Sequence, residues 1–253
     1  DGFIITAGNA NGTSTYSNGG GIVNYYMSSP TLTNCILRSN FATLGGAIAC
    51  GEFSNPEITN CTINENLATW GGGIGCGRDS SPIISNCLIN SNTAMSYGGG
   101  TYVINSNAII IGCTISENRA SSYGGGIFCE YLEPIISNCS ITKNVADIGG
   151  GGIGCLVSNP MITGCIISEN KAMQYHGGGI YCGRSSPSIV NCLIAANESA
   201  VDGGGIQCFS SIYGQSSPTV TSCTIADNFA ERGGGGISCE NSSTLTATNC
   251  IVW

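Results

Sequence analysis

The chain has 253 residues, of which 42% are apolar and only 9% are charged. The net charge of −8 comes from 15 acidic residues against seven basic ones. The basic residues are spread singly along the chain, so there is no basic patch to neutralise phosphates, which argues against nucleic-acid binding. No apolar run approaches the roughly 20 residues that a membrane-spanning helix requires.

Cysteine is unusually frequent, with 16 residues, and it recurs at a fixed period. One series, spaced by 26 residues apart from a few insertions, comprises Cys35, Cys61, Cys87, Cys113, Cys139, Cys165, Cys192, Cys223 and Cys250. A second series follows clusters of glycine and comprises Cys50, Cys76, Cys129, Cys155, Cys182, Cys208 and Cys239. A fixed period of roughly 20 to 50 residues is typical of solenoids. The chain is therefore predicted to be a stack of similar coils.

Within one coil, the consensus is GGGI-x-C-x-x-S-S-P-x-I-x-N-C-x-I-x-x-N-x-A. The glycine cluster leads into a short strand, in which alternation puts Ile74 and Cys76 on one face. After the S-S-P corner, Ile84, Cys87 and Ile89 share an inner side if the chain bends at the asparagine between them. These runs of three to five residues between glycine, proline and asparagine are too short for α-helices, so they are predicted to be strands.

Asparagine occupies two further columns of the repeat. The residue before the first-series cysteine is asparagine at Asn34, Asn60, Asn86, Asn138, Asn191 and Asn249. Glycine replaces it at Gly112 and Gly164, which indicates a left-handed backbone. The second column comprises Asn40, Asn66, Asn92, Asn118, Asn144, Asn170, Asn197 and Asn228. At the strand spacing of about 4.8 Å, stacked asparagines can hydrogen-bond to one another, so both columns are predicted to be structural ladders.

These elements predict an all-β fold, a right-handed parallel β-helix with three short strands per coil of about 26 residues and about nine coils. Its corners are expected at S-S-P, at the asparagine before cysteine and at N-x-A. Residues 1–253 are predicted to form a single β-helix domain. Since the sequence begins and ends within a coil, we expect either a fragment of a longer solenoid or a unit that stacks end to end into a filament.

The succession I-x-x-N-x-A followed by GGxI, as in Ile63 to Ala68 with Gly72 to Ile74, resembles the GGAI and FxxN repeats of chlamydial polymorphic outer-membrane proteins. It is also similar to the wider class of bacterial surface proteins with right-handed β-helix repeats. The resemblance covers essentially the whole chain and implies a secreted or cell-surface protein, including adhesins. The aromatic residue of FxxN is isoleucine or leucine here, and the repeat carries no catalytic residues.

The cysteines all fall at inward positions of the repeat. The simplest interpretation is a column of small, buried, free thiols, since cysteine is among the most buried residue types. The alternative is disulfides between adjacent coils, because the two cysteines of one coil lie on different walls. Zinc binding is disfavoured by the absence of a C-x-x-C pair and by a single histidine, His176, in a variable corner position. No metal and no cofactor are therefore expected.

Enzymes of the pectate-lyase type use a similar coil, so a polysaccharide-binding or polysaccharide-degrading protein, a lyase or hydrolase, is the alternative function. Such chemistry needs carboxylates that converge on one groove. Glu65, Glu117 and Glu169 lie on alternate coils just before the second asparagine column, and Asp227 holds the same position. This regular, dilute spacing is typical of a solvated face, so no catalytic residue is predicted.

Aromatic residues provide the candidate binding surface. Trp70, Tyr97 and Tyr123 precede the glycines of three successive coils. The outward position after the strand isoleucine holds Tyr102, Phe128 and Tyr181, and Tyr175 is expected beside them. Exposed aromatic strips bind sugars or protein partners, whereas ring stacking on a parallel sheet is the structural alternative. Corner insertions at residues 9–18 and near Ser210 to Gly214 are further candidates for recognition.

The sequence thus favours an extracellular or cell-surface structural scaffold, adhesin-like and without enzymatic activity. Its expected partners are further copies of itself or a glycan or protein at a cell surface. No nucleic acid and no membrane span within the chain are expected.

Overall fold

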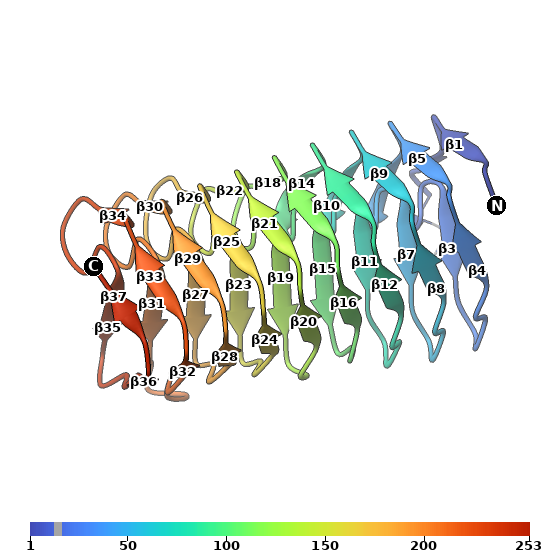
Figure 1. Cartoon of the computed structure of the whole chain (residues 1–253). Helices are drawn as coiled ribbons and strands as arrows, with labels where there is room; N and C mark the ends of the chain where they lie inside the picture. Colours follow the sequence, from blue (N-terminus) through green and yellow to red (C-terminus); the bar gives the residue numbers. More distant parts are fainter. Residues whose placement is uncertain (13–16) are drawn as a thin grey trace.

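A computed structural model describes residues 1–12 and 17–253, and it is a rod of stacked coils (Figure 1). The coils follow one another from the N-terminal end, drawn in blue, to the C-terminal end, drawn in red. Part of the expected insertion at residues 9–18 lies outside the described residues. Within the part of the chain that is described, no helix is long and apolar enough to cross a membrane.

Four parallel sheets run along the rod. Sheet A contains β1 (Ile4–Thr6), β5 (Ile36–Arg38), β9 (Thr62–Asn64), β13 (Leu88–Asn90), β17 (Thr114–Ser116), β21 (Ser140–Thr142), β25 (Ile166–Ser168), β29 (Leu193–Ala195), β33 (Thr224–Ala226) and β37 (Ile251–Val252). Sheet B contains β2 (Asn9–Ala10), β6 (Phe41–Leu44), β10 (Leu67–Trp70), β14 (Thr93–Tyr97), β18 (Arg119–Ala120), β22 (Val145–Ala146), β26 (Lys171–Ala172), β30 (Glu198–Ser199) and β34 (Phe229–Ala230). Sheet C contains β3 (Ile22–Asn24), β7 (Ile48–Cys50), β11 (Ile74–Cys76), β15 (Thr101–Ile104), β19 (Ile127–Glu130), β23 (Ile153–Leu156), β27 (Ile180–Gly183), β31 (Ile206–Phe209) and β35 (Ile237–Glu240). Sheet D contains β4 (Thr31–Thr33), β8 (Glu57–Thr59), β12 (Ile83–Ser85), β16 (Ile109–Ile111), β20 (Ile135–Ser137), β24 (Met161–Thr163), β28 (Ser188–Val190), β32 (Thr219–Thr221) and β36 (Thr246–Thr248).

Each coil therefore visits the sheets in the order C, D, A, B, and each strand pairs in parallel with its counterpart one coil away. The β-helix prediction is confirmed, but the prediction of three strands per coil is wrong, because there are four. The N-x-A segment was expected to be a corner and is instead a strand of sheet B. The reason is visible at Thr93, whose N–H donates to the carbonyl of Asn66 on the previous coil at 2.9 Å, while Ala94 points into the core.

The core consists of stacked isoleucine, alanine and cysteine side chains. First-series cysteines lie directly over one another, and the N–H groups of Cys61 and Cys87 each face the Sγ of the next cysteine at 3.4 Å. The expected thiol column is confirmed. All sixteen cysteines are free, and fourteen of them are buried. Burial raises the pKa of Cys155 to about 12, so this thiol stays protonated at neutral pH.

The first asparagine column acts through its backbone. Asn34, Asn60 and Asn86 have φ values of 55°, 54° and 52°, and Gly112 has 63° at the equivalent position. The predicted left-handed bend is confirmed, because asparagine and glycine tolerate this region best. The side chains of this column are exposed, however, so the expectation that they are buried as an amide ladder is wrong.

The second asparagine column forms the buried ladder. Each side-chain amide donates to the Oδ1 of the next asparagine, as from Asn92 to Asn118 at 3.0 Å and from Asn118 to Asn144 at 2.9 Å. The same Nδ2 also donates to a sheet A carbonyl of the previous coil. The amides thus satisfy one another and the adjacent backbone, which offsets the cost of burying them.

The glycine clusters allow neighbouring coils to approach closely. Gly71 has a φ of +65°, and a Cβ added at Gly72 would lie 2.4 Å from the carbonyl oxygen of Gly99. These positions therefore need glycine for backbone contact between coils.

Candidate functional site

The outer face of sheet C carries the aromatic residues that the sequence singled out. In register along this face lie Tyr102, Phe128, Gly154, Tyr181 and Gln207, each at the outward position between two core residues. A second row precedes the glycine clusters at the edge of sheet C, and its members are Trp70, Tyr97, Tyr123, Gly149, His176, Asp202 and Gly233. The structure thus brings the predicted residues to one side of the rod.

Five of these rings form one aromatic cluster, composed of Tyr97, Tyr102, Tyr123, Phe128 and Tyr181. The ring of Tyr97 stacks on Phe128 of the next coil with centroids 4.8 Å apart, and Tyr123 stacks on Tyr181 at 5.1 Å. Tyr102 and Phe128 are also stacked, at 5.8 Å. Such stacking contributes about 0.5–1.5 kcal/mol per pair beyond the burial of apolar area.

The expectation of a flat, exposed aromatic strip is wrong for the inner row. Phe128 is 1% exposed, and Tyr102 and Tyr181 are buried, because the edge residues fold back over the outward residues of the following coil. Burial raises the pKa of Tyr102, and the nearby carboxylate of Glu130, which accepts a hydrogen bond from its hydroxyl at 3.3 Å, raises it further. The accessible part of the predicted surface is therefore reduced mainly to Trp70 and Tyr175.

Three linked hollows follow the aromatic cluster toward the C-terminal end, and we call them together the groove. The first, of about 320 Å³, is lined by Tyr123, Ile148, Tyr175, His176, Tyr181 and Phe209. The second, of about 420 Å³, is lined by Leu156, Tyr181, Gly183, Arg184, Phe209, Ser211 and Tyr213. The third, of about 660 Å³, is lined by Phe209, Ser210, Ser211, Ile212, Gln215, Asn241 and Ser242. Because consecutive hollows share lining residues, they form one continuous surface.

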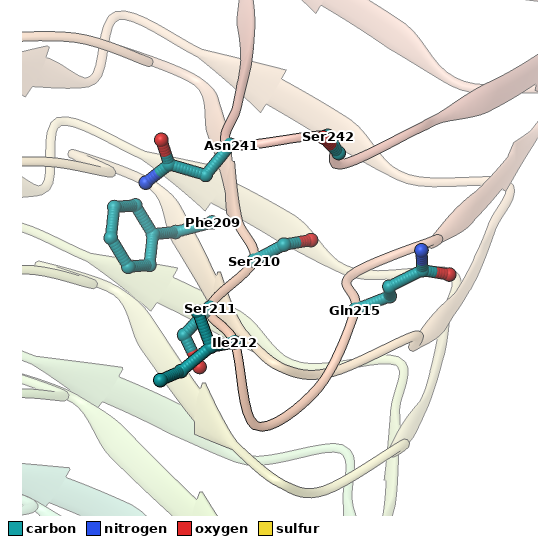
Figure 2. A pocket seen from close by; sticks show the side chains of 7 residues that line it. All are labelled: Phe209, Ser210, Ser211, Ile212, Gln215, Asn241 and Ser242. Atoms are coloured by element: carbon teal, nitrogen blue, oxygen red, sulfur yellow. The ribbon is translucent and has the colours of Figure 1, made fainter.

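The third hollow is built by the insertion that the sequence placed near Ser210 to Gly214. Ser211 and Gly214 exchange two backbone hydrogen bonds, which close the loop into a tight turn. The tip presents Ile212 and Tyr213, which are 91% and 81% exposed. Figure 2 shows Ile212 projecting from this loop, with the ring of Phe209 and the amide of Asn241 on the neighbouring segments.

Buried hydroxyl groups hold the base of the loop. The hydroxyl of Ser216 donates to the carbonyls of Cys182 and Phe209, at 2.9 and 2.8 Å. The N–H of Ser216 in turn donates to the hydroxyl of Ser210 at 2.8 Å. The loop is thereby fixed to two coils, so its tip is presented by a rigid base.

A further hollow of about 390 Å³ lies toward the N-terminal end of sheet C. Trp70 and Tyr102 line it together with Tyr25 and Arg78. Trp70 thus borders a separate depression and has no described ring contact with the aromatic cluster.

The acids that the sequence considered for catalysis lie elsewhere. Glu65, Glu117, Glu169 and Asp227 occupy the exposed left-handed corner between sheets A and B, with φ values between 54° and 57°. Glu169 pairs with Lys143 of the previous coil at 3.9 Å, and both side chains are exposed. None of these four acids lines the groove, as a solvated face predicts.

Sequence reasoning missed a group of three ionisable residues beside the groove. His176, Asp202 and Glu240 each place one potential ligand atom within 4.8 Å of the others. His176 and Asp202 lie on adjacent coils, with Nδ1 and Oδ2 3.8 Å apart. His176 was expected to be an isolated surface residue. Only the register of the glycine clusters, which puts residues 176 and 202 one coil apart, carried a signal for this pairing.

Comparison with known proteins agrees with the fold. The family model described as the right-handed β-helix region matches residues 3–156 and 105–253, which together cover nearly the whole chain. Neither the curated proteins nor the solved structures contain a match. The stacked parallel coils and the match to the family model lead to one conclusion: the chain belongs to the right-handed β-helix family.

Proposed function

We propose that the protein is a rigid β-helix scaffold that binds an extended glycan along the groove on sheet C. The observation that carries this proposal is the continuity of three hollows with aromatic and amide side chains in their walls. A chain of sugars is a repeating, elongated ligand, and the groove spans several coils in the same direction as the rod.

The side chains of the groove suit sugar chemistry. Tyr175 and Tyr213 are exposed aromatic residues, and aromatic faces pack on the C–H faces of sugar rings. Arg184, Gln215 and Asn241 offer hydrogen-bond donors for hydroxyl or carboxylate groups. A backbone held by ladders on every coil loses little conformational entropy on binding, which favours affinity.

The test is affinity electrophoresis against a panel of neutral and acidic polysaccharides. Tyr175→Ser and Tyr213→Ser are each expected to reduce the retardation that the unaltered chain shows. Phe229→Ser is the matched control, because Phe229 is 56% exposed on sheet B, outside the groove. If no polysaccharide retards the unaltered chain, or if the three variants behave alike, the groove is not a glycan site.

Polysaccharide degradation is the second candidate, and the cluster of His176, Asp202 and Glu240 favours it. Two carboxyl groups within 4.8 Å of each other have the separation from which glycoside-cleaving pairs are built. The polysaccharide panel is therefore also assayed for new reducing ends and unsaturated products. Product formation that Asp202→Asn abolishes would identify an enzyme, whereas retardation without product is expected for a scaffold.

Display outside the cell belongs to the same proposal. The resemblance to GGAI and FxxN repeats supports an adhesin-like role, in which a rod holds a binding surface away from the cell. Copies that stack end to end would lengthen the rod, and light scattering over a dilution series would detect them as a particle whose mass rises with concentration. A mass equal to one chain at every concentration would contradict stacking.

A further inference from the structure

We propose that His176, Asp202 and Glu240 form a binding site for a single divalent cation of the zinc class. The three residues come from three consecutive coils, and one ligand atom of each lies within 4.8 Å of the others. The site lies at the wall of the first hollow, which His176 itself lines. This inference is independent of glycan binding.

The rungs of the β-helix fix the positions of the ligands. The backbone of His176 is paired with Gly149, and that of Asp202 with Gly233. The hydroxyl of Ser199 donates to the carbonyl of Asp202 at 2.9 Å. Residues on adjacent rungs lie about 4.8 Å apart, so the two side chains need only small rotations to share one ion. A scaffold of this kind preorganises the site without a dedicated loop.

Polar atoms at the site lack partners that a bound ion would supply. The Nδ1 of His176 is fully buried and, among the described residues, accepts and donates no hydrogen bond. Gln207 is 0% exposed, and within residues 1–12 and 17–253 its Oε1 also has no hydrogen-bond partner. A Cβ added at Gly203, the residue after Asp202, would lie 2.7 Å from this oxygen. The buried amide oxygen therefore faces the backbone that carries the Asp202 carboxylate.

Unpaired buried polar atoms cost about 1–3 kcal/mol each in most proteins. A cation between His176, Asp202 and Glu240 would give the imidazole nitrogen a partner. A water molecule on that cation would give one to Gln207. The two orphaned atoms and the convergence of three ligands are separate observations, and one bound ion accounts for all of them.

The electrostatics of the site also favour a cation. The His176 imidazole is the only charged or chargeable group described within ion-pair distance of either carboxylate, and no lysine or arginine neutralises Asp202 or Glu240 in the described part of the chain. Two carboxylates carry the charge that a divalent ion cancels. The cation thus stabilises a negative charge that the protein leaves uncompensated.

The mixed ligand set selects the class of metal. Imidazole suits Zn²⁺ and its neighbours, whereas Ca²⁺ and Mg²⁺ prefer oxygen ligands alone. Zinc bonds of about 2.0–2.2 Å to nitrogen and oxygen require ligand atoms about 3.4 Å apart, which is close to the 3.8 Å between Nδ1 of His176 and Oδ2 of Asp202. Three protein ligands leave a fourth position for water or a ligand in the first hollow.

The test is isothermal titration calorimetry of Zn²⁺, Ca²⁺ and Mg²⁺ into the whole, tag-free chain. Accessible thiols are first alkylated under native conditions, so that the exposed Cys239 does not bind zinc. The expected result is one Zn²⁺ per chain, with much weaker binding of Ca²⁺ and Mg²⁺. Absence of Zn²⁺ binding, or tighter binding of Ca²⁺, overturns the proposal.

Variants locate the ion. Asp202→Asn and Glu240→Gln are each expected to weaken Zn²⁺ binding by more than about 100-fold, since outer partners of metal ligands alone contribute about 10- to 100-fold. Gln207→Met, which keeps the buried volume, is expected to weaken it by about 10-fold. Asp227→Asn removes the same charge from an exposed corner and should leave affinity unchanged.

A separate readout distinguishes the site from adventitious binding through sulfur. Co²⁺ bound in place of Zn²⁺ should show visible absorption without thiolate charge-transfer bands, and His176→Gln should change that spectrum. Circular dichroism of each variant without metal confirms that the fold is intact. Equal affinity in Asp202→Asn, Glu240→Gln and the unaltered chain, or a thiolate spectrum, contradicts the proposed site.

Discussion

Removing one amide from the buried asparagine ladder should destabilise the whole rod. In Asn118→Ala, four hydrogen bonds disappear. The side-chain amide of Asn118 donates to Asn144 and to the carbonyl of Ile89, both at 2.9 Å, and its Oδ1 accepts from the Nδ2 and the N–H of Asn92, both at 3.0 Å. The ladder is fully buried here, so water cannot replace these bonds without entering the core.

The magnitude follows from the net value of each bond. At about 1 kcal/mol per hydrogen bond, Asn118→Ala should lower the free energy of unfolding by about 4 kcal/mol. The N–H of Asn92 loses its acceptor in a buried site, which adds to the cost. For a chain of this size, 1 kcal/mol corresponds to a shift of about 2–4 °C in Tm, so the variant should melt about 8–16 °C lower.

The matched control is Asn86→Gly in the other asparagine column. Asn86 is exposed and has a φ of +52°, and glycine already stands at the equivalent positions of two neighbouring coils. This substitution should change the free energy of unfolding by less than about 0.5 kcal/mol. Both variants are followed by circular dichroism during thermal and urea denaturation. If Asn118→Ala lies within about 1 kcal/mol of Asn86→Gly, the amide ladder does not stabilise the fold as argued.

Three further predictions concern thiols, ionisation and close contacts between coils. Native alkylation should modify Cys239 first and should reach the fourteen buried thiols only after denaturation; fewer than sixteen alkylated sites without reductant would indicate disulfides. Because burial raises the pKa of Tyr102 above the value of about 10 for unfolded tyrosine, its contribution to stability should be complete below pH 10 and should fall as the pH rises further, which denaturation at stepped pH measures. Gly72→Ala should destabilise strongly because its Cβ meets a backbone carbonyl at 2.4 Å, whereas Gly236→Ala, with its nearest contact at 3.3 Å, should be tolerated in the same melting assay.

The repeat predicted the architecture because the same local geometry recurs on every coil. Twenty-six residues between cysteines, proline at one fixed corner and asparagine or glycine at another were sufficient to identify stacked strands and the left-handed bend at Asn86. The fourth strand was missed because the N-x-A segment is only two to five residues long. Its alternation between Asn92 and Ala94 is too short to distinguish a strand from a turn.

The candidate site was less predictable, because it depends on side chains that meet across coils. Period 26 shows which residues stack, but the direction of a long side chain depends on its neighbours. Phe128 is covered by Tyr97 from the previous coil, and Gly154 leaves room beside it, so an outward position became buried. Glu240 reaches Asp202 although the two differ by 38 positions, which no single period of the repeat indicates.

Departures from the period point to the groove more directly than any residue type does. The first-series spacing is 26 residues up to Cys165 and then becomes 27, 31 and 27 residues over the last three coils. The first extra residue falls in the turn with Tyr175 and His176, which line the first hollow. The second insertion builds the loop at residues 210–214, and the third falls at residues 240–246, which contribute Asn241 and Ser242 to the third hollow. A regular coil needs no insertion to fold, so each extra residue costs conformational entropy without adding to the core. Three such costs on one side of three consecutive coils are expected where the rod gains a ligand, and this pattern is the strongest reason to look for its partner at the groove.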